Sequence, residues 1–249
     1  MSIASAKSEA LSSQIELADS LSACDREQML VLMQTYYEGV SSRDFHRDLS
    51  EKHWVITLRA PSGEICGFST QVLLQVPGQF DSLTLFSGDT IIAAAYRGRN
   101  DLAGLWGRLA LEQIDLFPGK KLYWFLISKG YKTYRYLSLF FREFYPRHGV
   151  VTPPEFSNLI NALAERKFGD RFDATQGIVR ATEHGCHLRA EVAPVLSHRL
   201  RDPDVAFFVE SNPGHALGDE LCCLAPLHRQ NFTSVAYRVI AAASTTGTR

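Results

Sequence analysis

The chain has 249 residues, of which 45% are hydrophobic and 21% are charged, and this composition is typical of a globular protein. Its formal net charge of −1 excludes a global electrostatic attraction to nucleic acid or to an anionic membrane. No apolar run approaches the roughly 18 residues that a membrane-spanning helix needs. We therefore expect no nucleic-acid partner and no membrane association.

The cysteines do not indicate a disulfide framework. Five are present, no Cys-x-x-Cys pair occurs, and two of them, Cys222 and Cys223, are adjacent. Disulfide-stapled secreted domains use even numbers at regular spacings. The first residues, MSIASAKSEALSSQ, also lack the apolar segment of a signal peptide. These features predict a cytoplasmic protein with reduced thiols.

The N-terminal part predicts a helix followed by a β-hairpin. Residues 1–22 are polar and rich in serine and alanine, and we expect them to form a flexible segment or at most a weak helix. Asp25 precedes an apolar pattern of helical period that Gly39 ends. The runs 53–60 and 64–76 flank Pro-Ser-Gly, a good turn sequence, and therefore predict an antiparallel hairpin.

The middle of the chain predicts a long strand, a helix and a buried strand. The strand-like run 82–96 contains Gly88, which predicts a bulge or a close approach of backbone. Asn100 or Asp101 then caps a helix with leucine and tryptophan at helical spacing. The apolar segment 122–128 is typical of a buried strand.

The C-terminal half alternates helical and strand-like segments. The expected elements are an aromatic-rich helix from Tyr131 that stops near Pro146, a helix over 153–169, strands or loop over 177–196, a strand or short helix over 205–210, a buried strand over 220–227 and a last helix over 232–243. Strands that pair directly and strands that alternate with helices together predict an α/β or α+β fold with a mixed sheet.

The Arg-Gly-Arg sequence at 97–99 lies where a strand enters a helix. The first turn of a helix exposes unpaired N–H groups and the positive end of the helix dipole. A small residue there lets a phosphate approach the backbone, and two arginines add charge. The sequence therefore indicates an anion site, although a surface turn with two solvated arginines fits it equally well.

The order of elements resembles the GNAT acyltransferase superfamily over roughly residues 25–147. In this family, a hairpin and a long bulged strand precede an Arg/Gly turn that opens a helix. The resemblance implies a mostly antiparallel mixed sheet in which the bulged strand splays from its neighbour. It also implies one domain over 23–249, with the core at 25–147 and an extension at 148–249 that completes the sheet and the acceptor pocket.

The resemblance implies a pantetheine thioester as the acyl donor. The family loop Gln/Arg-x-x-Gly-x-Gly/Ala begins at Arg97, but its two small positions fall on Asn100 and Leu102. The donor is thus acyl-CoA, or acyl-phosphopantetheine on an acyl carrier protein, as in the relatives that make acyl-homoserine lactones or N-acyl amino acids. The expected donor-binding residues are Ala95, Tyr96, Arg97, Gly98, Arg99, Asn100 and Asp101.

Candidate catalytic residues follow from the chemistry of amine acylation, which needs a base for the amine proton and an acid for the thiolate. Asp89 is costly in an apolar strand unless it is paired or used, so it is the first candidate base. It also fits as the cap of a bulge. The resemblance implies a tyrosine on the helix after 122–128, where Tyr134 and Tyr136 are candidates. A packed aromatic face accounts for each of them as well.

Acceptor-binding candidates lie in three segments. His46 belongs to the connector that borders the acceptor site in the resemblance, and Ser87 lies beside Asp89. Glu210 and Asp219 flank a polar loop that suits an amine, although turn chemistry accounts for this loop too. The pair His184 and His187 around Cys186 lacks a clear third ligand, so no metal is expected.

Together these observations predict an acyltransferase that moves an acyl group from acyl-CoA or acyl carrier protein to the amine, or hydroxyl, of a small molecule. Two alternatives remain open. The same scaffold suits a non-catalytic protein that binds an acyl ligand or a partner, and it suits a thioester hydrolase.

Overall fold

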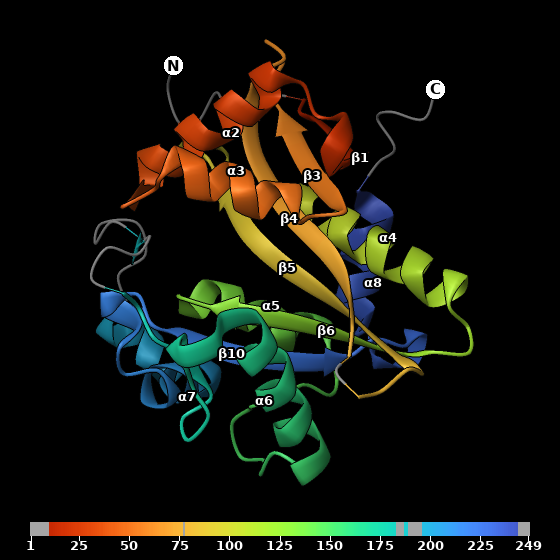
Figure 1. Cartoon of the computed structure of the whole chain (residues 1–249), viewed down its shortest axis with the longest axis vertical. Helices are drawn as coiled ribbons and strands as arrows, with labels where there is room; N and C mark the ends of the chain where they lie inside the picture. Colours follow the sequence, from red (N-terminus) through yellow and green to blue (C-terminus); the bar gives the residue numbers. More distant parts are fainter. Residues whose placement is uncertain (1–9, 77, 183–186, 189–195, 244–249) are drawn as a thin grey trace.

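The computed structural model describes residues 10–76, 78–182, 187–188 and 196–243. Their main feature is an eight-stranded sheet in the order β1-β3-β4-β5-β6-β10-β8-β7 (Figure 1). Its strands are β1 (Ser12–Leu17), β3 (Trp54–Arg59), β4 (Ile65–Gln75), β5 (Ser82–Ile92), β6 (Lys121–Ser128), β7 (Phe172–Asp173), β8 (Ile178–Val179) and β10 (Glu220–Pro226). A second, two-stranded sheet joins β2 (Tyr37–Glu38) to β9 (His187–Leu188).

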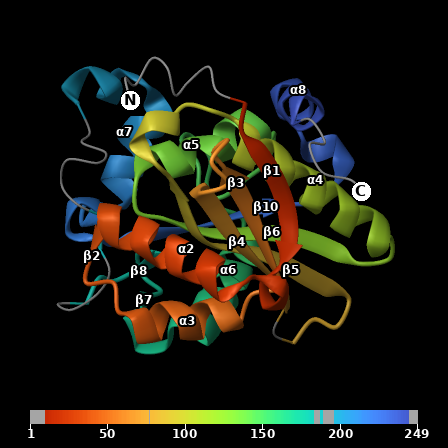
Figure 2. The same ribbon diagram turned by 90° about the horizontal axis from the view of Figure 1, so that it is seen from above.

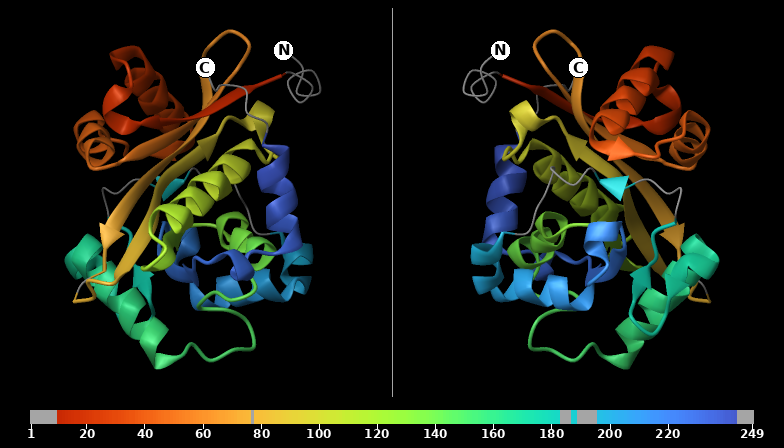
Figure 3. Two further views of the ribbon diagram at one scale, coloured as in Figure 1. Left: turned by 90° about the vertical axis from the view of Figure 1, so that its right-hand side faces the viewer. Right: turned by 90° about the vertical axis from the view of Figure 1, so that its left-hand side faces the viewer.

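Helices cover both faces of the large sheet (Figures 1 and 3). One face carries α2 (Ala23–Tyr36), α3 (Ser42–Ser50) and α6 (Pro154–Phe168). The other face carries α4 (Asp101–Leu116), α5 (Tyr131–Phe140), α7 (Pro203–Ser211) and α8 (Ser234–Ala242). The predicted fold class is therefore confirmed: a mixed, mostly antiparallel sheet flanked by helices.

The sequence of each strand distributes its side chains between the two faces. Successive side chains of a strand point to opposite sides of the sheet. Accordingly, Leu85 belongs to the apolar core under α4 and α5, whereas the next residue, Phe86, belongs to the core under α6. Trp124 and Phe125 of β6 divide in the same way. These strands are buried on both faces, which accounts for their almost continuous apolar runs.

Strands β5 and β6 form the one parallel pair of the sheet within the described residues, and they separate before they end. Their pairing runs from Ser82–Lys121 to Ser87–Leu126. Beyond that point β5 continues to Ile92 beside β4 alone, and β6 continues to Ser128 beside β10 alone. The two strands start together and diverge in Figure 1. Backbone groups of both strands therefore face a gap in the sheet rather than a neighbouring strand.

The predicted irregularity at Gly88 is a bulge of β5 at this gap. Strand β4 has one residue, Thr70, where β5 has two, Gly88 and Asp89. The backbone approach there is also close, because a Cβ atom on Gly88 would lie 2.6 Å from Thr70 Oγ1 and 2.9 Å from Lys52 Cε. Glycine is thus needed for space, and the bulge sets the direction of the Asp89 side chain.

Several predicted boundaries differ from the observed ones. Residues 12–17 form edge strand β1 on β3, although they fall in the segment 1–22 for which the sequence predicts flexibility or at most a weak helix. The strand expected to reach residue 96 ends at Ile92, and a single turn of 3-10 helix follows. The aromatic helix ends at Phe140, because Phe141 and Tyr145 form bridges to Phe232 and Leu224. Residues 203–211 form a helix, one of the two expected alternatives.

Helix α4 is packed between elements from both ends of the chain. It contacts β1 and β3 on one side and α8 on another (Figure 2). Gly104 and Gly107 allow the contact with α8, since a Cβ atom on either residue would overlap with Ala243 or Ile240. None of the described helices has the length and apolar character that crossing a membrane requires.

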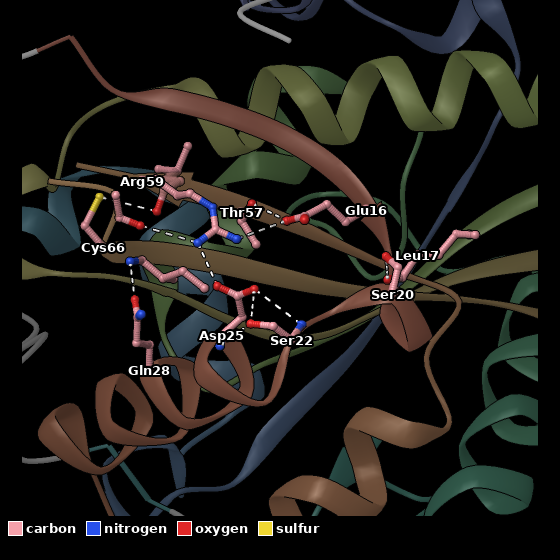
Figure 4. Close-up of polar contacts among 12 residues, drawn as sticks. Glu16, Leu17, Ser20, Ser22, Asp25, Gln28, Thr57, Arg59 and Cys66 are labelled. Carbon is pink, nitrogen blue, oxygen red and sulfur yellow. Dashed lines mark hydrogen bonds and ion pairs between the residues drawn. The ribbon is translucent and has the colours of Figure 1, made fainter. Parts of the chain in front are cut away.

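Arg59 joins β1, α2 and β3 through charged contacts (Figure 4). Its Nη1 lies 2.7 Å from Asp25 Oδ1, and its Nη2 lies 3.6 Å from Glu16 Oε2. Asp25 also completes a capping box with Ser22 at the start of α2. The hydrogen bond from Arg59 is the main reason that the pKa of Asp25 lies below its ordinary value. Because its partners are largely buried, this interaction contributes more than an exposed ion pair.

We expect Arg59→Met to lower the free energy of unfolding by about 1–2 kcal/mol at pH 7, since it leaves Asp25 without its charged partner. The difference from wild type should shrink as the pH falls through the lowered pKa of Asp25, because protonation removes the same interaction. Urea denaturation at several pH values measures both effects. The matched control is Lys121→Met, which removes an exposed pair to Asp81 and should change stability by less than about 0.5 kcal/mol. Equal losses of unfolding free energy in both variants would contradict the inference that the Arg59–Asp25 pair contributes more than an exposed ion pair.

Candidate functional site

A cavity of about 680 Å³ passes through the gap between β5 and β6. Ser87, Gly88 and Asp89 line it from the bulged strand, and Leu126 and Ile127 line it from β6. Its other walls come from α4 and α5 on one face of the sheet and from α3 and α6 on the opposite face. The cavity therefore connects the two faces, and its two halves have different chemistry.

The half under α4 and α5 is mainly apolar. Its walls include Leu102, Ala103, Trp106, Trp124, Thr133, Tyr136 and Phe140. The rings of Trp106 and Trp124 lie 4.3 Å apart, and the buried Nε1 of Trp106 has no hydrogen-bond partner within the described chain. Burial raises the pKa of Tyr136, so this hydroxyl keeps its proton at neutral pH. This half suits an extended, largely apolar ligand. It offers this ligand two hydrogen-bond donors, the indole N–H of Trp106 and the hydroxyl of Tyr136.

The half between α3 and α6 is charged. Asp89 and Glu220 contribute carboxylates, and Lys129 and Lys167 contribute ammonium groups. Glu220 is buried at the start of β10, where Lys129 Nζ lies 3.6 Å from its Oε1. Lys167, on the last turn of α6, lies over the ring of Phe86 with 4.6 Å from its Nζ to the ring centroid. Buried charges of this kind are costly unless they are paired or bind a ligand.

Asp89 lines the charged half from the bulge of β5, and its pKa is raised. Burial is the main cause, and the nearby carboxylate of Asp48 adds to it, while Lys129, Lys52 and Lys167 oppose it. The pKa of Glu220 is raised as well, mainly by burial. A carboxylate with a raised pKa is a stronger base than an exposed aspartate, and it is therefore better suited to accept a proton near neutral pH.

A chain of hydrogen bonds fixes the polar side chains next to Asp89. Trp124 Nε1 donates to Ser87 Oγ at 2.9 Å, and the Ser87 hydroxyl donates to Gln71 Oε1 at 2.6 Å. Gln71 Nε2 in turn donates to Ser69 Oγ at 2.8 Å, which pairs with Thr90 Oγ1 at 2.6 Å. The Ser87 hydroxyl donates to an amide rather than to a base, so the chain positions Ser87 and does not activate it as a nucleophile.

The predicted donor loop lies at one edge of the cavity. Ala95 and Tyr96 belong to the 3-10 turn before it, and Gly98 has a φ of +88°, a conformation that favours glycine. Arg99 is held by Asp101, with Nε 2.9 Å from Oδ2. Asn100 is the N-cap residue of α4 without a side-chain cap bond. Residues 95–101 do not line the cavity; its nearest walls are Ile92 before the loop and Leu102 after it.

Arg97 contacts the first long helix of the chain. Its guanidinium lies 4.8 Å from the centre of the Tyr36 ring, and the Tyr36 hydroxyl accepts a hydrogen bond from Ala94 N at 2.6 Å. The loop is therefore joined to α2. In the donor-loop pattern, small residues let a phosphate approach the backbone. Gly104 of α4 instead allows close packing against α8.

The structure brings together three of the predicted catalytic and acceptor-binding residues. Asp89, Tyr136 and Ser87 all line the cavity. Tyr134 does not line it: this residue is fully buried, and its hydroxyl donates to Pro146 O at 3.0 Å. His46 lies on α3, but other residues of this helix form the cavity wall.

The two acidic residues expected to flank an amine-binding loop lie outside the cavity. Glu210 is exposed on α7. Asp219 binds Arg180 at 2.7 Å and accepts a hydrogen bond from Ala181 N at 2.8 Å, so it anchors the chain after β8. Its neighbours Gly218 and Glu220 line the cavity instead. Cys186 and His184 lie outside the described residues.

Sequence reasoning missed Lys129 and Lys167 as cavity residues, whereas the cavity residue Glu220 belongs to the polar loop whose acidic groups it expected to hold an amine. Glu220 ends the polar stretch 210–220, so the sequence carries a signal for it. Lys129 directly follows β6 on the side where β5 has turned away, which only the sheet topology shows. Lys167 follows Arg166 in the last turn of α6, where basic residues are common for electrostatic reasons alone.

No protein-family model and no curated protein matches the chain. Solved structures do match it. One is the GNAT family N-acetyltransferase YhbS from Escherichia coli in complex with CoA, with 16% identity, a TM-score of 0.34 and coverage of 53% of this chain and 69% of that chain. Another is a probable N-acyltransferase from Enterococcus faecalis, with 12% identity, a TM-score of 0.41 and coverage of 54% and 33%. A third is NAA60 from Arabidopsis thaliana in complex with acetyl-CoA, with 11% identity, a TM-score of 0.38 and coverage of 56% of this chain and 92% of that chain. At such low values the likeness carries no argument about what this chain binds.

We expect Gly88→Ala to lower the free energy of unfolding by about 1–3 kcal/mol, because the new Cβ atom would overlap with Thr70 and Lys52 at the bulge. Urea denaturation gives the change. Gly119→Ala is the control, since no atom lies within 4 Å of its added Cβ. If both variants were equally stable, the close packing at the bulge would not be a constraint on the site.

Proposed function

We propose that the protein is an acyltransferase that moves an acyl group from a pantetheine thioester to an amine of a small molecule. The observation that carries the proposal is the cavity that crosses the sheet at the divergence of β5 and β6, with Asp89 of the bulge in its wall. An apolar half on one face and a charged half on the other suit two substrates that meet in the gap. The predicted resemblance to GNAT acyltransferases agrees with this arrangement.

The half under α4 and α5 suits the donor. An extended pantetheine arm has amide groups, and the backbone groups of β5 beyond Ser87 face the gap without a strand beside them. They offer the arm the hydrogen bonds that a neighbouring strand would make. The indole of Trp106 offers a further donor inside the apolar wall. The same backbone N–H groups can polarise the thioester carbonyl, which lies at the gap in this arrangement.

The phosphate end of the donor would lie at the start of α4, where the helix N-terminus and the arginines of the loop give positive potential. Two features there support phosphopantetheine on an acyl carrier protein as well as CoA. Asp101 adds negative charge to the first turn, and the buried Leu102 replaces a small residue of the CoA-binding pattern. Relatives that make acyl-homoserine lactones or N-acyl amino acids take donors of this kind, and we propose the same donor class here.

The reaction uses a base and an acid on opposite faces of the sheet. The amine nitrogen attacks the thioester carbonyl, and the Asp89 carboxylate takes the proton that the nitrogen loses as the C–N bond forms. The tetrahedral intermediate then collapses, the C–S bond breaks, and the leaving thiolate takes a proton from the Tyr136 hydroxyl. Proton exchange with water restores both side chains. The products are an amide and a free thiol.

We expect acyl-CoA or an acylated carrier protein to raise the thermal midpoint of the protein, because a ligand at a hundred times its Kd stabilises the native state by about 2.7 kcal/mol. Thiol release should then depend on an added amine, which a thiol-reactive dye and mass spectrometry of the amide detect together. Binding without thiol release would support a non-catalytic ligand-binding protein instead. Thiol release without amide would support a thioester hydrolase, and no binding of any thioester would reject the proposal.

Asp89→Asn should reduce acyl transfer by about 10²-fold or more and leave donor binding unchanged, since it removes the base only. It should also make the ligand-free protein more stable at pH 7. Because the folded-state pKa of Asp89 is raised above 3.8, ionisation of this group costs stability as the pH rises past that value, and asparagine avoids this cost. The stability gain should disappear at about pH 3.

The matched control for this variant is Asp81→Asn, directly before β5. Asp81 is exposed, lies 3.8 Å from Lys121 Nζ and accepts a hydrogen bond from Ser82 Oγ at 3.1 Å, which an asparagine oxygen can also accept. Its replacement should leave both acyl transfer and stability at the wild-type level. Full turnover by Asp89→Asn, with the control unchanged, would show that another group is the base.

A further inference from the structure

The charged half of the cavity contains more ionic groups than its ion pairs neutralise. Four of its charged residues, Asp44, Arg47, Glu51 and Arg171, are exposed to solvent, and the first two pair with each other at 2.6 Å. Two further ion pairs are Asp48–Lys52 at 2.6 Å and Glu220–Lys129 at 3.6 Å.

Two half-buried charges of opposite sign are left over. Within the described chain, the side chains of Asp89 and Lys167 make no hydrogen bond or ion pair with another residue. They lie near enough to shift each other's pKa, but no ion pair joins them. A carboxylate and an ammonium group that stand apart in one cavity are each available to a ligand, and each is costly to keep without one.

The contacts of Lys167 show what it can bind. Its Nζ lies 4.6 Å from the centre of the Phe86 ring and 5.9 Å from that of Phe168, and the carboxylates of Asp48, Glu51 and Asp89 act on it only from beyond ion-pair distance. Burial and the charge of Lys52 lower its pKa, which means that its charge is only partly compensated by the protein. An anionic group of a ligand would neutralise the charge of Lys167 that the protein leaves uncompensated.

We propose that the acceptor is a zwitterion whose amine lies at Asp89 and whose carboxylate lies at Lys167, that is, an amino acid or a molecule with the same two groups. The proposal rests on the proposed acyltransferase function and names its acceptor class. One left-over carboxylate and one left-over ammonium group match one positive and one negative charge. A simple amine would leave Lys167 uncompensated, and a phosphate, with nearly two negative charges, would exceed what one lysine neutralises.

The arrangement also places the acceptor for the reaction. Lys167 is on α6 and Asp89 is on the bulge of β5, so a molecule held at both ends would span the charged half with its nitrogen toward the gap. The ring of Phe86 lies between these two elements on the same face of the sheet and would contact the carbon atoms of the acceptor. Lys167 is thus a specificity-determining residue and takes no part in proton transfer.

The test is a comparison of matched ligands. Isothermal titration of the full-length protein with amino acids, with the amines that lack their carboxylate, and with phosphoethanolamine gives the preference directly. We expect at least one amino acid to bind wild type about tenfold or more tightly than its decarboxylated amine. Lys167→Gln should abolish this preference and leave the affinity for the amine unchanged. Lys167→Arg should retain most of it, and Lys132→Gln, an exposed site on α5, should behave as wild type.

Three outcomes would overturn the zwitterion proposal. They are equal affinity of wild type for amino acids and amines, a preference for phosphoethanolamine over every amino acid, and an amino-acid preference that survives in Lys167→Gln. Thiol release measured in parallel separates this proposal from the proposed function. Amino-acid binding without acyl transfer would keep the zwitterion site and reject the activity, whereas transfer to simple amines alone would keep the activity and reject the site.

Discussion

The separation of two parallel strands is the constraint on which the rest of this molecule depends. In a complete ladder, every backbone group of β5 would face one of β6, and side chains would fill both faces. Here the ladder stops at Ser87 and Leu126, although both strands continue. The sheet therefore has an opening bordered by backbone groups. In the proposed function, the extended pantetheine arm of the donor lies there in the place of a strand.

The bulge makes this opening chemically useful. An extra residue in β5 opposite Thr70 changes the alternation of side chains, so Asp89 belongs with the charged groups of α3 and α6, while Ser87 bonds to Trp124 on the other face. The charged side chains around it are mostly paired, which leaves a small number of groups to recognise a ligand. The few charges without an ion pair lower the free energy of unfolding, as is common at functional sites.

How far the sequence predicts this site depends on the kind of signal. Gly88 predicts the bulge because glycine weakens the interior of a strand and is typical of places where the backbone bends or is closely approached. The divergence of β5 and β6 has no signal in the residues of the two strands, because strand pairing is a tertiary property, and it is expected only from the resemblance to GNAT acyltransferases. Strand β1 escapes prediction because SSQIEL is mostly polar and becomes ordered through β3 and the Arg59 contacts. Lys167 escapes it because a basic residue beside Arg166 is ordinary at the end of a helix.

The contact between α4 and α8 has a consequence for how the chain is made. The glycine face of α4 is shaped to fit α8, which is the last helix of the described residues, and α4 also contacts β1, the first strand. A nascent chain must therefore hold α4 with an uncovered apolar side until the residues of α8 have left the ribosome. The core under α4 closes only then, so folding of this face waits for more than a hundred further residues to be made, and chaperone contact is expected to be longest at this helix.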